Sequence, residues 1–136
     1  MAQPSVDVLQ RVPLFAGLEP RELRQIAESF KAREYAAGDT VATEGQSGVG
    51  FFVIESGEAT VSVHGGEVGR LKAGDHFGEI ALIDEGARTA TVTADTELVC
   101  YGMSFWEFRP IVESNSQIAW KLLQTLAKQL RAAEQR

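Results

Sequence analysis

The residues best suited to chemistry lie in one stretch, residues 77–92. Gly78 and the apolar run after Glu79 predict one helical turn, and the first turn of a helix presents unpaired backbone N–H groups that attract an anion. Arg88 follows an acidic loop and is the only basic residue between Lys72 and Arg109. Its guanidinium supplies paired donors that match a phosphate. An ionised Glu79 only accepts hydrogen bonds, so it can receive a hydroxyl donor.

A structural ion pair is the alternative interpretation of the same two side chains. Glu79 and Arg88 lie nine residues apart, and this spacing alone favours a pair that ties the loop to the surrounding strands. The complete stretch of residues 77–92, set among strand-like segments, favours ligand binding instead.

Segments rich in Val, Thr and Phe recur at roughly 8–12-residue intervals over residues 31–103, separated by glycine-containing turns. This pattern is typical of an antiparallel β region. A hairpin is predicted between residues 59–64 and 67–71 through Gly65-Gly66, a pair that can adopt positive φ values. Alternation along the first strand places Val61 and Val63 on one face, which we expect to point into a core.

Helical patterns flank this β region. Ser5 can cap a short N-terminal turn that Pro13 closes, and Glu19-Pro20 can open a second helix. Ser104 can cap a helix after the β region, and Ser116 a longer one. That last helix is predicted to be amphipathic, with an apolar stripe of Ala119, Leu122, Leu123, Leu126, Ala127, Leu130 and Ala133.

These elements predict a mainly β fold with flanking helices, in the α+β class. The length of 136 residues is typical of one domain, which we expect to span residues 1–136. N-terminal helices would occupy residues 1–30, an antiparallel β jelly-roll barrel of about eight strands residues 31–103, and C-terminal helices residues 104–136. The short phosphate-binding helix would lie inside the barrel.

Residues 77–92 resemble the phosphate-binding cassette of cyclic nucleotide-binding domains, the sensors of cAMP receptors, protein kinase A regulatory subunits and cyclic-nucleotide-gated channels. In that cassette, Phe-Gly-Glu precedes apolar residues, a short loop, then Arg, a small residue and Ala. The resemblance extends to Glu44-Gly45 and to residues 51–54, 56–58 and 73–75. One departure is Gln46, where many members carry an acidic residue, in a turn outside the cassette.

The resemblance implies specific roles. Arg88 would pair with the cyclic phosphate, and Glu79 would accept from the ribose 2′-hydroxyl. Backbone N–H groups near Ile80, Ala81 and Ala90 would complete the cradle. The C-terminal helix would close over the base as a lid. The expected ligand-binding residues are Gly78, Glu79, Ile80, Ala81, Arg88, Thr89 and Ala90. The expected base and lid contacts are Val61, Val63, Leu122, Leu123 and Leu126.

Composition narrows the other function classes. A net charge of −6 disfavours nucleic-acid binding by this chain, because such binding relies on Lys and Arg displacing counterions. No signal peptide or membrane-spanning run is evident, so we expect a cytoplasmic protein. Cys100 is the only cysteine, and we expect it to be a small buried apolar side chain. His64 and His76 have no neighbouring histidine, so no metal or other cofactor is expected.

We therefore predict a non-catalytic sensor that binds cAMP, with cGMP as the other candidate. Binding would move the C-terminal helices about a hinge, which the resemblance places near residues 104–115. A jelly-roll metalloenzyme is disfavoured by the few histidines. A ligand-free interaction scaffold that forms a homodimer through the C-terminal helix remains the alternative. An effector domain or protein partner outside the sequence would supply the output.

Overall fold

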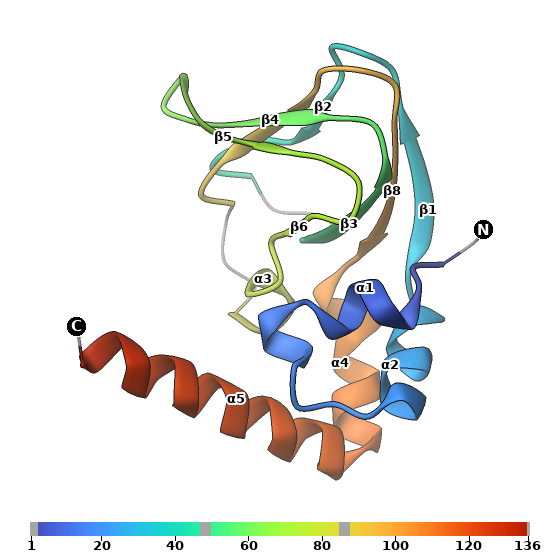
Figure 1. Cartoon of the computed structure of the whole chain (residues 1–136), viewed down its shortest axis with the longest axis vertical. Coiled ribbons are helices and arrows are strands. Elements are labelled where there is room, and N and C mark those ends of the chain that lie inside the picture. The colour runs from blue at the N-terminus through green and yellow to red at the C-terminus, as the bar shows by residue number, and fades with distance from the viewer. Residues whose placement is uncertain (1–2, 47–49, 85–87, 136) are drawn as a thin grey trace.

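The computed structural model describes residues 3–46, 50–84 and 88–135. Two four-stranded antiparallel sheets lie above a group of helices (Figure 1). One sheet has the order β1-β8-β3-β6 and the other β2-β7-β4-β5. The strands are β1 (Lys31–Tyr35), β2 (Thr40–Ala42), β3 (Phe51–Ser56), β4 (Ala59–Val63), β5 (Gly66–Leu71), β6 (His76–Phe77), β7 (Thr91–Ala94) and β8 (Leu98–Met103).

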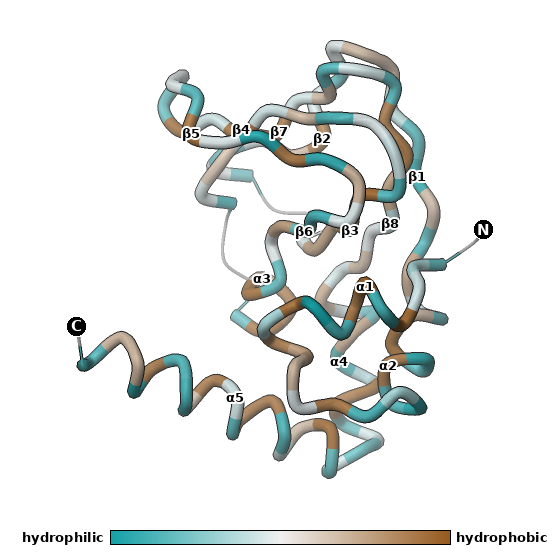
Figure 2. Tube along the Cα trace, viewed as in Figure 1, coloured by the Kyte–Doolittle hydropathy of each residue, from teal (hydrophilic) through white to brown (hydrophobic). Residues whose placement is uncertain are grey.

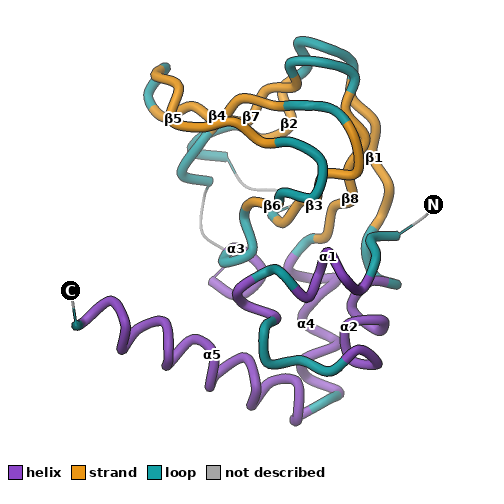
Figure 3. The backbone as a smooth tube through the Cα atoms, viewed as in Figure 1, coloured by secondary structure: helices purple, strands orange, loops and turns teal. Residues whose placement is uncertain are grey.

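Helices gather at one end of the molecule, while strands occupy the other (Figure 3). The helices are α1 (Val6–Gln10), the 3-10 turn η1 (Pro13–Phe15), α2 (Pro20–Ala27), α3 (Ala81–Asp84), α4 (Phe105–Ser114) and α5 (Ser116–Glu134). None of the described helices is both long and apolar enough to cross a lipid bilayer.

The predicted fold class is confirmed, with one difference in how the sheets meet. Strands run from Lys31 to Met103 and helices flank them, as the residue patterns predict. In the described part of the chain the two sheets pack against each other without strand pairing between them, so they form an open roll and not a closed barrel. Apolar packing between the sheets replaces the hydrogen bonds that would close a barrel.

Strand β3 explains how the two halves of the core connect. Its side chains alternate between two apolar clusters: Phe51 and Val53 pack with the helices, and Phe52 and Ile54 pack between the sheets. A strand buried on both faces is continuously apolar, which accounts for the run at residues 51–54. One face of β3 therefore contributes to the apolar core between the two sheets, and the other face to the core formed with the helices.

The helix starts are largely as expected. The Val8 N–H donates to Ser5 Oγ at 3.2 Å, and the Ser104 N–H donates to the Glu107 carboxylate at 2.9 Å. Helix α1 ends at Gln10, before Pro13, and Pro13 begins the 3-10 turn η1. The predicted cap of α5 is wrong by one residue: Asn115, and not Ser116, accepts from the first turn of α5. The side-chain Oδ1 of Asn115 accepts from the N–H groups of Gln117 and Ile118, at 3.1 and 3.2 Å.

The hairpin of β4 and β5 also turns one residue earlier than predicted. Val63 pairs with Gly66, so the turn residues are His64 and Gly65, with φ values of 51° and 83°. His64 adopts this less favoured conformation while its N–H donates to Glu44 Oε1 at 2.9 Å. The register of the two strands then shifts at an irregularity between Ser62 and Val61, where Ser62 pairs with Glu67 and Val61 with Gly69. The hydrogen bond that His64 donates to the distant Glu44 explains why glycine is not needed at this position.

Helix α5 runs below the rest of the molecule and away from the sheets (Figure 1). Its first half is anchored by the buried side chains of Ile118 and Leu122. Apolar and polar residues alternate along its whole length (Figure 2), and residues 127–135 are exposed. In this structure α5 therefore packs against other helices and not over the sheets.

Candidate ligand-binding site

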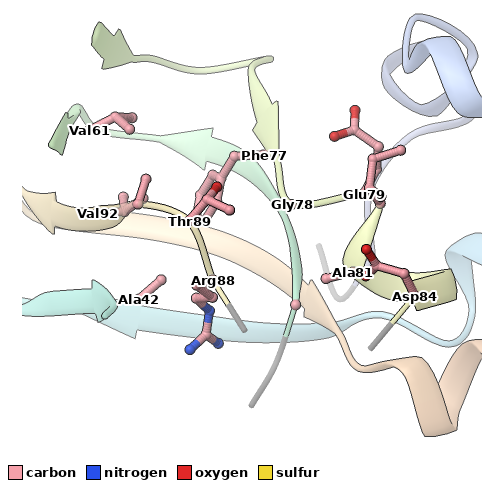
Figure 4. A pocket seen from close by; sticks show the side chains of 13 residues that line it. Ala42, Val61, Phe77, Gly78, Glu79, Ala81, Asp84, Arg88, Thr89 and Val92 are labelled. Carbon is pink, nitrogen blue, oxygen red and sulfur yellow. The ribbon is translucent and has the colours of Figure 1, made fainter. Parts of the chain in front are cut away.

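A cavity of about 300 Å³ lies between the strands of the second sheet and α3. Segments far apart in the sequence form its wall, as Figure 4 shows. The lining residues are Ala42, Gly50, Val61, Phe77, Gly78, Glu79, Ile80, Ala81, Asp84, Arg88, Thr89, Ala90 and Val92. All seven residues expected to bind ligand are in this set, as is Val61.

The helical turn in the wall starts later than predicted. Helix α3 begins at Ala81, after a turn in which the Ala81 N–H donates to the Gly78 carbonyl at 3.1 Å and the Leu82 N–H to the Glu79 carbonyl at 3.2 Å. The Ala81 N–H, expected to face a ligand, therefore donates within the turn in this structure. The turn brings Glu79 and Ile80 to the cavity wall.

Gly78 is required by both conformation and space. Its φ of +84° is a value that residues with a Cβ rarely adopt. A Cβ at this position would also collide with the Gly50 carbonyl oxygen, and a Cβ on Gly50 would stand 2.9 Å from the Cβ of Ala81. The start of β3 and the start of α3 therefore lie in direct backbone contact, which fixes the turn against the sheet.

The main chain of Arg88 is held on both sides by a neighbouring turn. The Gly45 N–H donates to the Arg88 carbonyl at 2.8 Å, and the Arg88 N–H donates to the Gln46 carbonyl at 3.1 Å. The Glu44 N–H donates to Thr91 Oγ1 at 3.0 Å just beyond. Gln46, which departs from the family pattern, thus touches Arg88 through its backbone, and a backbone contact tolerates a change of side chain.

The Arg88 side chain is partly buried at the cavity. Burial lowers the pKa of the Arg88 guanidinium below its ordinary value, and Tyr35 on β1 opposes that shift. An arginine nevertheless keeps its charge in a protein. The cavity therefore contains a partly desolvated cation, which is an environment that strengthens attraction to an anion.

Glu79 is paired with a histidine. Its Oε2 lies 2.9 Å from Nε2 of His76, and both side chains are about one quarter exposed, 22% and 24% respectively. This hydrogen bond is the largest influence on the Glu79 carboxyl and lowers its pKa, against the opposing effect of burial. Figure 4 shows Glu79 and Arg88 extending in opposite directions. Glu79 is thus paired with His76. The alternative interpretation, a structural ion pair between Glu79 and Arg88, requires a different partner.

The expected lid residues lie outside the cavity in this structure. Val63 is partly exposed on β4 and does not line the cavity. Leu122, Leu123 and Leu126 line a second hollow of about 400 Å³ between α3, α4 and α5. Leu82 and Ile83 of α3 contribute to that second hollow, while Ala81 and Asp84 line the first. Helix α3 is therefore a shared wall between the candidate site and the C-terminal helices.

Five lining residues were not anticipated from the sequence: Ala42, Gly50, Phe77, Asp84 and Val92. Alternation along β7 could have identified Val92, which pairs with Val61 across the sheet. Phe77 is part of the recognised cassette and stacks on Phe52 with ring centroids 4.9 Å apart. Ala42 and Gly50 carry no local signal, because their positions depend on long-range strand pairing.

The described residues include no group of three His, Cys, Asp or Glu side chains placed to hold a metal ion. His64 lies 3.2 Å from Glu44, and His76 faces Glu79. Cys100 is buried between the sheets, and burial raises the pKa of its thiol to about 11. The thiol is therefore protonated at neutral pH.

Comparisons with known proteins agree on one family. A family model described as "Cyclic nucleotide-binding domain" matches residues 32–115. The cAMP-dependent protein kinase regulatory subunit of Aspergillus niger is 42% identical over 92 residues, which cover 66% of this chain and 22% of that protein. The corresponding subunit of Eremothecium gossypii is 44% identical over 93 residues, covering 68% and 20%. The chain spans about a fifth of the length of these relatives.

Solved structures have the same fold. The N-terminal domain of a transcriptional regulator from Streptomyces coelicolor A3(2) superposes with a TM-score of 0.86 at 30% identity, covering 93% of this chain and 94% of that one. The catabolite activator protein of Thermus thermophilus gives a TM-score of 0.69 at 29% identity, covering 90% and 60%.

Proposed function

The chain belongs to the cyclic nucleotide-binding domain family, whose model matches more than half of its residues, and from this we propose that its cavity binds cAMP in preference to cGMP. We further propose that the chain acts as a regulatory sensor and performs no catalytic step. One observation carries the proposal: Arg88, Glu79 and apolar residues line one cavity of about 300 Å³.

In this proposal, each part of the ligand has a partner of suitable chemistry. The cyclic phosphate carries one negative charge and pairs with Arg88, whose backbone is already fixed by Gly45 and Gln46. The ribose 2′-hydroxyl donates to Glu79, which the low pKa of its carboxyl keeps ionised. Backbone N–H groups near Ile80 and Ala90 complete the cradle, and Val61 lies on the side where the base would sit.

The proposed output is a movement of the C-terminal helices. Helix α3 lines both the cavity and the apolar hollow under α5, so a shift of α3 on ligand binding would change the packing of α4 and α5. Leu122, Leu123 and Leu126 would then move towards the base. A ligand can drive such a change only if it binds one arrangement more tightly than the other.

The proposed movement of the C-terminal helices would act on an effector domain or protein. The relatives from Aspergillus niger and Eremothecium gossypii are named as kinase regulatory subunits, and the Streptomyces structure as part of a transcriptional regulator. We propose that this chain likewise controls an effector domain or protein, in response to the nucleotide.

Calorimetric titration of the chain with cAMP and with cGMP tests the proposal. The control ligand is 5′-AMP, which has the same base and ribose but an open phosphate. We expect saturable 1:1 binding of cAMP, weaker binding of cGMP and little binding of 5′-AMP. A chain that binds neither cyclic nucleotide, yet sediments as a dimer, would support the ligand-free scaffold instead.

A further inference from the structure

We propose that His76 is a positioning residue for sugar recognition: it holds one oxygen of the Glu79 carboxylate so that the other is presented to the ribose. The proposal rests on the proposed function and extends it to a residue outside the cavity lining. The ligand feature that it recognises is a hydroxyl donor at the ribose 2′ position.

The His76 ring is itself fixed. His76 lies on β6 and pairs with Val53 of β3. Its ring packs edge-on against Phe51, with ring centroids 6.1 Å apart and an interplanar angle of 77°. Phe51 is completely buried. The imidazole is therefore placed by the sheet and the core before any ligand arrives.

The contact uses only part of the carboxylate. His76 Nε2 lies 2.9 Å from Glu79 Oε2, and with the proton on Nε2 the ring donates to that oxygen. A carboxylate offers about four acceptor positions, so Glu79 can still accept from a ligand hydroxyl beside the contacts from His76 and from its own backbone N–H. Glu79 lines the cavity. The contact with His76 therefore limits the directions in which the Glu79 carboxylate can accept from a ligand.

Fixing Glu79 in advance strengthens binding by reducing the entropy lost when the ligand arrives. A glutamate side chain loses substantial rotamer freedom when it is immobilised, and that loss normally weakens binding. His76 imposes much of this order in the free protein. The opposite role, a latch that holds Glu79 away from the ligand, would make removal of His76 strengthen binding.

The test compares His76→Ala and His76→Gln by calorimetry with cAMP and with 2′-deoxy-cAMP. We expect His76→Ala to weaken cAMP binding by about 3- to 10-fold, the affinity equivalent of one hydrogen bond, with little change for the 2′-deoxy ligand. His76→Gln, whose amide can still donate, should recover most of the loss. In a Glu79→Gln background, His76→Ala should have no further selective effect on cAMP.

Thermal unfolding of each variant shows whether it is folded, and His76→Phe provides a variant that keeps the ring packing on Phe51 without the donor. Equal losses for both ligands, or tighter cAMP binding by His76→Ala, would overturn the positioning role. Failure of the parent chain to bind any cyclic nucleotide would instead overturn the proposed function, so the two failures are distinct.

Discussion

Lys121 on α5 reaches the buried carboxylate of Glu22 on α2, with Nζ and Oε1 2.8 Å apart. Only 4% of the Glu22 side chain is exposed. Burial raises the pKa of this carboxyl, but hydrogen bonds from the Glu19 backbone and from Lys121 outweigh it, so the pKa is lowered overall. The contact ties the first half of α5 to the N-terminal helices, and it leaves residues 127–135 exposed.

This contact predicts a specific acid sensitivity. Because the folded-state pKa of Glu22 lies below its usual value of 4.5, the ionised carboxylate stabilises the fold above that pH, and the contribution is lost as the pH falls through the lower folded-state pKa. Glu22→Gln should reduce the free energy of unfolding at pH 7 by about 1–3 kcal/mol. It should also make stability fall less steeply below about pH 5.

Urea unfolding at several pH values measures both effects. Glu113→Gln is the matched control, since Glu113 pairs with Arg109 at 3.2 Å on the exposed face of α4 and an exposed pair contributes little. A Glu22→Gln variant with the same pH dependence as the parent would show that the buried contact does not govern acid stability.

Alanine substitutions at Gly78 and Gly74 distinguish the effect of a positive φ on stability from the effect of a steric clash. Both have positive φ, +84° and +89°, but a Cβ on Gly74 meets nothing within 4 Å, whereas one on Gly78 collides with the Gly50 carbonyl oxygen. Gly74→Ala should lower the free energy of unfolding by about 1–2 kcal/mol, the penalty for a left-handed residue. Gly78→Ala should lower it further, because the backbone of β3 or the cassette must shift.

Chemical denaturation of the two variants provides the comparison, and cAMP titration should show a loss of affinity for Gly78→Ala alone. Equal stability losses would mean that the close approach between Gly78 and Gly50 does not constrain the cassette.

Local patterns anticipated much of the fold and part of the site. The strand-rich region was predicted because turns and alternating apolar residues recur over residues 31–103, and the cassette because its residues are consecutive. Those signals depend only on neighbours in the chain. They identified α3 to within three residues. They also identified most of the cavity-lining residues between Gly78 and Ala90.

Features set by distant contacts were missed. His64 occupies a turn position because Glu44, twenty residues away, accepts from its N–H. The opposite wall of the cavity contains Ala42 and Gly50, which reach it through sheet pairing. The location of α5 depends on Lys121 and a buried glutamate 99 residues earlier. An amphipathic stripe predicts that a helix packs, but it does not identify the surface that receives it.

Glu79 is expected to recognise the sugar. Glu79→Gln should weaken cAMP binding less than loss of Arg88 does, and should narrow the preference for cAMP over 2′-deoxy-cAMP, because a hydrogen bond to a charged acceptor contributes about 1.5–3 kcal/mol. Parallel titrations with the two nucleotides measure this preference. If the variant discriminates between them as strongly as the parent, the ribose contact belongs to another residue.

Thr89 is expected to affect the choice of base. It is exposed at the cavity wall beside Arg88, where its hydroxyl can donate to or accept from a guanine in the syn conformation. The remaining base contacts proposed here are apolar and favour adenine modestly. Thr89→Ala should therefore reduce cGMP affinity more than cAMP affinity in matched titrations. A parent that prefers cGMP would refute the selectivity, and equal losses would exclude Thr89 as its determinant.

The central claim is that Arg88 binds the cyclic phosphate, and calorimetric titration of Arg88→Ala with cAMP tests it most directly. Removing one partner of a buried charge pair costs roughly 2–5 kcal/mol, so we predict a loss of affinity of about 30-fold or more in a variant that remains folded. Arg70→Ala is the control, because Arg70 is 71% exposed, pairs with Glu67 at 3.3 Å and lies outside the cavity lining. Unchanged cAMP affinity in a folded Arg88→Ala variant would contradict the account.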